Sequence, residues 1–243
     1  MKDNKKQQII AIGGGGFSKF GEYSPVNNLM EEYILKQTGK INPSVCFIPT
    51  ASGEAPKYII DFYRFFGSLE CRPSHLSLFE LPSANLESFI LEKDVIYVGG
   101  GNTKSMLALW KEWKLDIYLK RALELGVVLS GISAGANCWF EECITDSIPG
   151  NLTPLSCLGF ISGSCCPHYD GEKKRRPTYL NLIQNSQISN GIAIDDHVAL
   201  HYIDNKLERV VRANDTGSAY KVFKKDNSIK EERLAANFIK EML

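Results

Sequence analysis

The sequence predicts an α/β protein, a three-layer sandwich with a mostly parallel central sheet. Short apolar or β-branched runs alternate with longer amphipathic stretches, a pattern typical of parallel strands joined by crossover helices. Clusters of glycine follow two of these runs directly, at Gly13–Gly16 and Gly99–Gly101. The length of 243 residues, with no low-complexity linker, indicates one domain over residues 1–243.

The first half of the chain predicts five strands, each a short apolar run: Ile9–Ile12, Val45–Ile48, His75–Leu78, Asp94–Val98 and Val127–Gly131. Helices are predicted between them from apolar residues at helical spacing: Asn27–Lys36, Pro56–Phe66, a helix beginning around Thr103, and Leu115–Leu125. Pro56 can open its helix because a proline in the first turn loses no hydrogen bond. Gly126 ends the last of these helices.

Beyond Pro154 the pattern changes to shorter segments. Phe160–Cys166 is predicted as a strand and Thr178–Gln184 as a helix. The runs that follow are short and joined by turns such as Asp204-Asn205: Ile192–Ile194, Val198–Ile203, Leu207–Val211 and Ala219–Phe223. We expect C-terminal antiparallel hairpins packed on the α/β core.

Composition excludes several classes of function. The 28 basic and 28 acidic residues cancel, which argues against binding of nucleic acid through a basic surface. The apolar stretch after the charged N-terminus is too short for a signal peptide, and no segment approaches the ~20 apolar residues of a membrane helix. Seven scattered cysteines without a CxxC pair indicate reduced thiols. We expect a soluble, cytoplasmic protein with no metal and no cofactor.

The segment Gly131-Ile132-Ser133-Ala134-Gly135 has the form of a nucleophile elbow. A serine hydroxyl attacks well only when it is held exposed, beside a base and near backbone donors, and a sharp strand-to-helix turn exposes it. Such a turn crowds the backbone, so glycine is needed two residues before and two residues after the serine. Ser133 is therefore the candidate nucleophile, and Ala134 N–H is a natural oxyanion donor.

A second glycine turn, Gly99-Gly100-Gly101-Asn102, follows the preceding predicted strand. The carboxyl ends of parallel strands border one crevice, where ligands bind. Glycines there allow the backbone to approach a substrate, and a second N–H would complete the oxyanion hole. The turn lacks the lysine of a phosphate-binding P-loop, which disfavours a nucleotide site.

The base must come from four histidines. His75 lies in a strand-like stretch and is expected to be structural, while His197 and His201 lie on a predicted hairpin. His168 ends a strand and enters a polar loop, where active-site groups project, and it is the preferred base. Asp196 is the leading candidate for the acid that orients it. Asp195 and Asp146 are the alternatives.

These segments occur in the order seen in the peptidase E family, which the chain resembles from about Ile9 to past His201. The shared segments are the turn Val98–Thr103, the elbow at Ser133, Thr145-Asp146, Pro167-His168 and Ile194–Asp196. The family comprises aspartyl dipeptidases, is related to the cyanophycinases, and has a fold like class I glutamine amidotransferases with serine at the elbow.

The resemblance implies Ser133 as nucleophile, His168 as base, and Gly100 and Ala134 as oxyanion donors, with Gly101 and Asn102 beside the site. Asp196 falls where the family usually has glutamate. Because aspartate is one methylene shorter, either the backbone approaches more closely or Asp146 takes part of the role.

The family's dipeptidases hold an N-terminal aspartate with basic residues after the histidine, which here implies Arg175 or Arg176. The predicted function is hydrolysis of dipeptides or short peptides through an acyl-enzyme, by a monomer or homodimer. Two alternatives remain: an esterase of the α/β-hydrolase type that uses His197 or His201, and a non-catalytic member that binds a small ligand.

Overall fold

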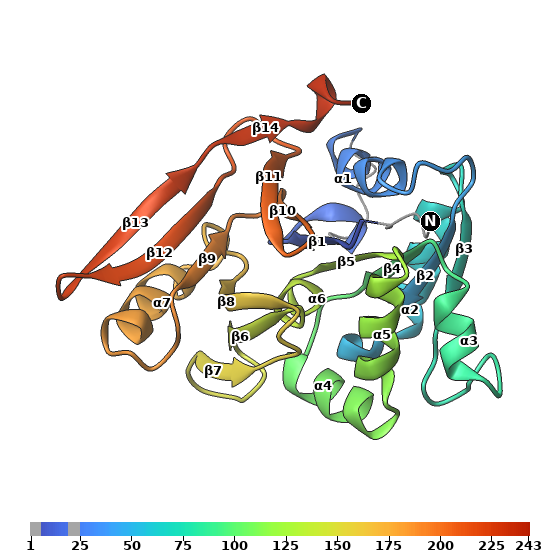
Figure 1. Ribbon diagram of the computed structural model, residues 1–243, viewed down its shortest axis with the longest axis horizontal. Helices are drawn as coiled ribbons and strands as arrows, with labels where there is room; N and C mark the ends of the chain where they lie inside the picture. Colours follow the sequence, from blue (N-terminus) through green and yellow to red (C-terminus); the bar gives the residue numbers. More distant parts are fainter. Residues whose placement is uncertain (1–5, 19–24) are drawn as a thin grey trace, which may run out of the picture.

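The apolar runs of the sequence form the centre of an eight-stranded sheet in the computed structural model, which describes residues 6–18 and 25–243 (Figure 1). Its strands, in spatial order, are β14 (Ala236–Phe238), β11 (Lys206–Arg212), β10 (Val198–Ile203), β1 (Gln8–Ile12), β5 (Val128–Ile132), β4 (Val95–Val98), β2 (Ser44–Ile48) and β3 (Arg72–His75). The strands from β1 to β3 are mutually parallel. The charged start of the N-terminus, residues 1–5, lies outside the described residues.

Both faces of the central sheet are buried, and successive residues of each strand serve opposite faces. Along β1, Ile9 and Ala11 belong to one apolar core, whereas Ile10 and Ile12 belong to a second core on the other face. Strand β2 alternates in the same way. Burial of both faces explains why these strands read as continuous apolar runs.

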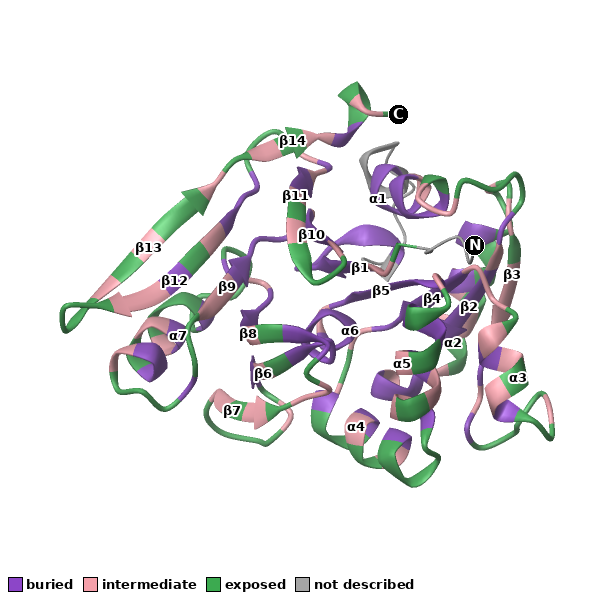
Figure 2. Cartoon of the chain, in the orientation of Figure 1, coloured by how far each residue is buried: buried purple, intermediate pink, exposed green. Residues whose placement is uncertain are grey.

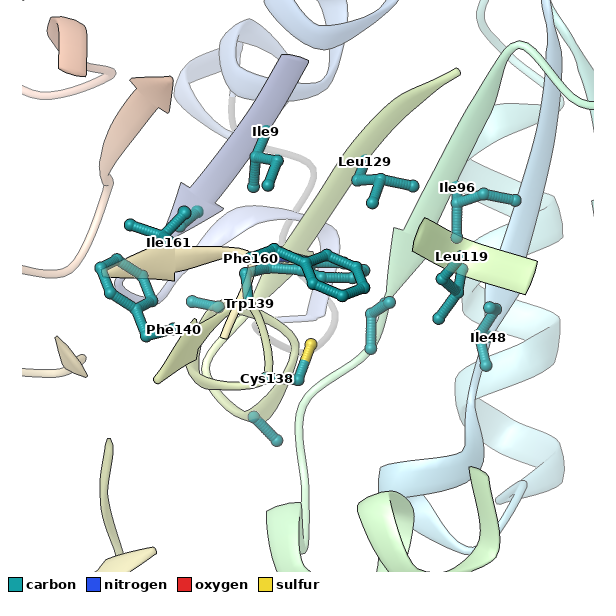
Figure 3. Close-up of a cluster of buried hydrophobic side chains, with 14 of the residues drawn as sticks. Ile9, Ile48, Ile96, Leu119, Leu129, Cys138, Trp139, Phe140, Phe160 and Ile161 are labelled. Carbon is teal, nitrogen blue, oxygen red and sulfur yellow. The ribbon is translucent and has the colours of Figure 1, made fainter. Parts of the chain in front are cut away.

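Helices cover the two faces as separate layers. Helices α1 (Pro25–Lys36) and α2 (Pro56–Phe66) contribute to the core that contains Ile10, and α3 (Leu86–Leu91), α4 (Thr103–Glu112) and α5 (Leu115–Glu124) contribute to the core that contains Ile9. Figure 3 shows part of the latter core, where Leu119 of α5 lies near Ile48 and Ile96 of the sheet. The sequence-based prediction of an α/β fold with a mostly parallel sheet is confirmed.

The C-terminal half differs from its prediction. Instead of simple antiparallel hairpins, it builds a second, mixed sheet of six strands. In spatial order these are β13 (Ser228–Leu234), β12 (Ala219–Lys225), β9 (Gly191–Ile194), β8 (Ile161–Cys166), β6 (Phe140–Thr145) and β7 (Thr153–Ser156). Strand β8 pairs in parallel with both β6 and β9, so no hairpin joins them. Helix α7 (Arg175–Gln184) packs on this sheet in a third apolar cluster.

One predicted hairpin, β10–β11, does form, and a second hairpin that was not predicted, β12–β13, forms in the other sheet. Strands β10 and β11 join the edge of the central sheet, and β12 pairs with β13 in the second sheet. Asp204-Asn205 and Asp226-Asn227 make their turns, each residue with a positive φ, as a tight two-residue hairpin turn requires. Figure 2 shows that much of β13 is exposed, and its charged sequence explains why the sequence analysis missed it.

Other differences are local. The third strand lies at Arg72–His75, earlier than the predicted His75–Leu78. The pairing of β3 with β2 ends at His75 and Phe47, and beyond this point the chain leaves the sheet. Helix α3 and strands β6, β7 and β14 were not predicted. Within the described residues, no helix is long and apolar enough to span a bilayer.

Candidate active site

Ser133 occupies the sharp turn between β5 and the short helix α6 (Ala134–Asn137). Its backbone has φ 57° and ψ −110°, a conformation that costs a non-glycine residue on the order of 1–3 kcal/mol. The turn is held in place because Ser133 N–H donates to Ile12 C=O at 3.1 Å, and the N–H groups of Ala136 and Asn137 both donate to Ser133 C=O at 2.9 Å. The geometry is that of a nucleophile elbow.

The two flanking glycines are required by the space around this turn. A Cβ on Gly131 would lie 2.4 Å from the carbonyl oxygen of Gly135, and one on Gly135 would lie 2.2 Å from the carbonyl oxygen of Val98. The backbone atoms at these two contacts cannot move aside to make room for a side chain. The close approach also explains how the elbow packs against the end of β4.

His168 follows β8 and Pro167 and has a positive φ of 55°, which turns its side chain away from the strand direction. Its Nδ1 lies 2.7 Å from Oδ1 of Asp196, and the two side chains are only 21% and 12% exposed. Because a carboxylate only accepts hydrogen bonds, the pair places the imidazole proton on Nδ1 and leaves Nε2 as the acceptor. This is the arrangement of a general base and its orienting acid.

Two glycines leave room for the side chain of Asp196. A Cβ on Gly14 would lie 1.9 Å from Oδ1 of Asp196 and 2.5 Å from Nδ1 of His168, and one on Gly171 would lie 2.8 Å from Oδ2 of Asp196. Asp170 Oδ1 also accepts from Asp196 N–H at 2.8 Å. Asp196 Oδ1 thus reaches His168 Nδ1 at 2.7 Å, and Asp146 makes no hydrogen bond with His168 within the described residues.

Ser133 and His168 border one cleft with a volume of about 470 Å³. The described residues that line it come from four segments: Ser52, Ala55, Lys57, Tyr58, Asp61, Gly100, Ile132, Ser133 and His168. Ser133 and His168, both within the described part of the chain, make no direct hydrogen bond, and such pairs often close only when substrate binds. The volume is in the range of small-ligand pockets.

Two residues predicted as oxyanion donors lie beside Ser133. Gly100 lines the cleft, and a Cβ on it would lie 3.8 Å from Ser133 Oγ. Ala134 directly follows the nucleophile, and its N–H makes no hydrogen bond with any described residue. Both lie where the sequence predicted oxyanion donors.

Other predicted site residues lie outside the cleft. Gly101, with φ 138°, packs against Ala51, where a Cβ would lie 2.2 Å from the carbonyl oxygen. Asn102 caps α4: its Oδ1 accepts from Ser105 N–H at 2.9 Å, while its Nδ2 donates to Ser147 C=O at 3.0 Å. Both residues therefore hold the turn between β4 and α4 in place.

The two predicted carboxylate-binding arginines also lie away from the cleft. Arg175 is buried, only 3% exposed, and its guanidinium contacts Glu172 Oε2 at 2.7 Å and the carbonyl oxygen of Ile144 at 3.1 Å. Arg176 pairs with Glu231 of β13 at 2.7 Å. Both guanidinium groups are therefore used within the protein.

The alternative acids have other partners. Asp146 is 67% exposed and lies 3.6 Å from Arg175. Asp195 accepts from Ser218 N–H at 2.9 Å, and burial raises its pKa to about 6 although that hydrogen bond opposes the shift. Within residues 6–18 and 25–243, neither carboxyl is hydrogen-bonded to His168.

The remaining histidines have structural surroundings. His75 Nδ1 lies 2.8 Å from the Tyr63 hydroxyl, and the ring of His197 packs against Gly15. His201 is buried between the Tyr33 hydroxyl at 2.7 Å and Gln8 Oε1 at 3.1 Å, and this burial lowers its pKa to about 4. None of these three histidines is among the described residues that line the cleft.

Sequence reasoning missed one wall of the cleft, formed by the loop after β2 and the first turns of α2. The signal was present, because this loop also stands at the carboxyl end of a parallel strand. It contains no glycine cluster beside the strand and no histidine, so nothing in it indicated catalysis. Across residues 6–18 and 25–243, no three His, Cys, Asp or Glu side chains converge as metal ligands would.

The sequence matches the pattern of Peptidase family S51 over residues 9–210. It is 52% identical to the uncharacterized peptidase YgaJ of Bacillus subtilis, over 96% of this chain and 99% of that protein. A more distant relative is peptidase E of Pasteurella multocida, 27% identical over 76% of this chain and 81% of that protein.

Two solved structures share the fold. A peptidase from an acI-B1 actinobacterium superposes with a TM-score of 0.70 at 18% identity, covering 96% of both chains. A putative peptidase E protein from Listeria monocytogenes superposes with a TM-score of 0.58 at 19% identity, covering 95% of this chain and all of that one. At these identities the likeness shows the fold alone.

Proposed function

The chain belongs to peptidase family S51, the family of peptidase E, and on this premise we propose that it hydrolyses dipeptides or short peptides with Ser133, His168 and Asp196 as its catalytic triad. The observation that carries the proposal is the shared cleft: the strained serine and the histidine paired with Asp196 border the same 470 Å³ space. A non-catalytic binding protein has no need of that strain.

The mechanism is acyl transfer. His168 Nε2 takes the proton of Ser133 Oγ, which attacks the carbonyl carbon of the scissile amide, while Asp196 stabilises the charged imidazole. The N–H groups of Gly100 and Ala134 stabilise the oxyanion. His168 then gives the proton to the departing amine. A water molecule, activated by the same imidazole, releases the acyl group from Ser133.

The lining of the cleft supports a substrate with a free carboxylate. Lys57 is the cation that borders the cleft among the described residues, where it pairs with Asp61 four positions along α2. A lysine at the start of a helix opposes the helix dipole, and its exposed pair with Asp61 contributes only roughly 0.2–0.5 kcal/mol, so a substrate carboxylate can compete for the ammonium group. We infer that Lys57, rather than Arg175 or Arg176, binds a carboxylate of the substrate.

Active-site variants test the triad. Ser133→Ala and His168→Gln should abolish dipeptide hydrolysis, and Ser133→Ala should also abolish labelling by a fluorophosphonate. Asp196→Asn should lower kcat by roughly 10⁴-fold, as expected when the imidazole loses its orienting acid, whereas Asp146→Asn should change kcat little. Loss of activity at His201→Gln with retention at His168→Gln would instead support the esterase arrangement.

Substrate pairs test the role of Lys57. Lys57→Gln should raise KM roughly tenfold for the substrate whose carboxylate it binds, because a charge-assisted hydrogen bond is lost. Comparing N-terminal Asp with Asn, and a free C-terminus with an amidated one, identifies that carboxylate. If Lys57→Gln affects all four substrates equally, Lys57 does not set specificity.

A further inference from the structure

The hydroxyl of Tyr58 occupies a position next to the proposed oxyanion hole. Gly100 N–H donates to the Tyr58 hydroxyl oxygen at 3.3 Å, and Tyr58 borders the same cleft as Ser133 and His168. Gly100 itself lies against the nucleophile. A phenol oxygen therefore stands beside the N–H to which the polarised oxygen of a substrate would bind.

The tyrosine ring is fixed by its neighbours. It packs edge-to-face on Phe47, with ring centroids 5.0 Å apart, and lies tilted against Phe17, with ring centroids 5.5 Å apart. A Cβ on Gly99 would lie 2.9 Å from Cε1 of Tyr58, so glycine at this position is what admits the ring. Within the glycine turn, Gly99 therefore makes room for the Tyr58 ring, while Gly100 exposes its backbone N–H. A hydroxyl held this way reaches the cleft without losing further side-chain entropy on binding.

We propose that Tyr58 is a further catalytic residue, whose phenolic O–H donates a hydrogen bond to the oxyanion beside the N–H of Gly100. The proposal rests on the peptidase mechanism given above. When Ser133 Oγ bonds to the carbonyl carbon, the π electrons move to the oxygen, which then accepts from Gly100 N–H. The Tyr58 oxygen lies within hydrogen-bond distance of that same N–H, and its O–H can rotate toward the new anion. Tyr58 keeps its proton throughout.

The same geometry allows an opposite effect. If the hydroxyl held Gly100 N–H in the substrate complex as well, it would block the oxyanion hole instead of completing it. A variant without the hydroxyl would then be faster than the wild type. Donation is open to the hydroxyl because a phenol is both donor and acceptor. Rotation about the C–O bond turns its hydrogen toward an anion that shares Gly100 N–H, and the ring stays in place.

Tyr58→Phe tests the proposal, with Tyr63→Phe as the matched control. Tyr63 lies on the same helix, but its hydroxyl contacts His75 and not the cleft. Tyr58→Phe should lower kcat on the order of 10²-fold, the usual effect of removing one oxyanion donor, with little change in KM. The affinity for a peptide boronic acid, which forms a tetrahedral adduct, should fall in parallel. Tyr63→Phe should alter neither quantity.

The outcomes separate this proposal from the general mechanism. If Ser133→Ala is inactive while Tyr58→Phe keeps wild-type kcat or exceeds it, the role of Tyr58 is wrong and the triad stands. If Ser133→Ala retains activity, the triad itself is wrong.

A second variant gives a signature that a structural role would not. A fluorinated tyrosine placed at position 58 ionises near neutral pH, and its phenolate cannot donate a hydrogen bond. We expect kcat of that variant to fall with rising pH where the wild-type value does not. An unchanged pH profile would overturn the proposal.

Discussion

Glu31 is an acidic side chain enclosed in an apolar core. It is fully buried, and its Oε1 accepts from Phe17 N–H at 3.3 Å and from the Tyr97 hydroxyl at 3.4 Å. Its Oε2 has no hydrogen-bond partner in the described structure. Desolvation by burial is the largest effect on this carboxyl and raises its pKa to about 8. Glu31 therefore carries a proton at pH 7.

This burial makes stability depend on pH. In the unfolded chain the carboxyl loses its proton near its ordinary pKa of 4.5, whereas in the folded chain it keeps it until about pH 8. The folded state therefore binds the extra proton between these values, and stability falls as pH rises, by up to about 1.4 kcal/mol per unit. Glu31→Gln should flatten this slope, so the melting temperature of the wild type should fall relative to that of the variant as pH rises from 5 to 8. Parallel melting curves for the two proteins would contradict it.

Among the elements, the segment from Gly13 to Phe17 connects the buried carboxyl to the proposed active site. Gly16 approaches Glu31, with a Cβ position 2.6 Å from Oε1, and Gly14 approaches the His168–Asp196 pair. Gly14 C=O also accepts from His197 N–H at 2.8 Å. The first glycine cluster thus leaves room for the His168–Asp196 pair. The sequence showed the cluster but not what it faces.

Gly14→Ala should disable the enzyme without unfolding it. The added methyl would overlap Asp196 Oδ1 and His168 Nδ1, and a displacement of about 1 Å in a catalytic group can cost on the order of 10² in rate. The control is Gly39→Ala, at a positive φ with open space around it, which should cost about 1–2 kcal/mol of stability and no activity. A wild-type kcat for Gly14→Ala would show that the His168–Asp196 pair can move without loss of activity.

At the scale of the whole molecule, one apolar core joins the two sheets. The core that contains Ile9 and Leu129 of the central sheet also contains Phe140 and Ile161 from the second sheet (Figure 3). The ring of Trp139 stacks on that of Phe160, and its centroid lies 6.5 Å from the ring centroid of Trp110 of α4. The elbow at Ser133 lies between β5 of the first sheet and β6 of the second. We therefore expect the two sheets to fold as one unit.

Hydrogen exchange tests this unity. The most protected amides of β5 and β8 should exchange with the same free energy of opening, because neither sheet keeps its core when the other unfolds. Phe140→Ala, a loss of about 3–5 kcal/mol from a shared core, should lower both values equally. A drop confined to β8 would mean that the second sheet opens as a separate unit.

The sequence by itself determined the parallel core and the elbow. Local signals suffice for both: strands buried on two faces must be continuously apolar, as at Val45–Ile48, and only glycine fits two residues before and two residues after Ser133. Hydrogen bonding also agrees with the preference for His168 and Asp196, which the sequence placed 28 residues apart.

Only the tertiary structure decided the pairing of the second sheet and the lining of the cleft. Strand β13 is charged and exposed, so no apolar pattern marks it. Arg175 is buried against Glu172, whereas Lys57 and Tyr58 reach the cleft from α2, more than seventy residues before the nucleophile. Which side chains border a cleft depends on contacts between distant segments, and the local order of residues does not encode those contacts.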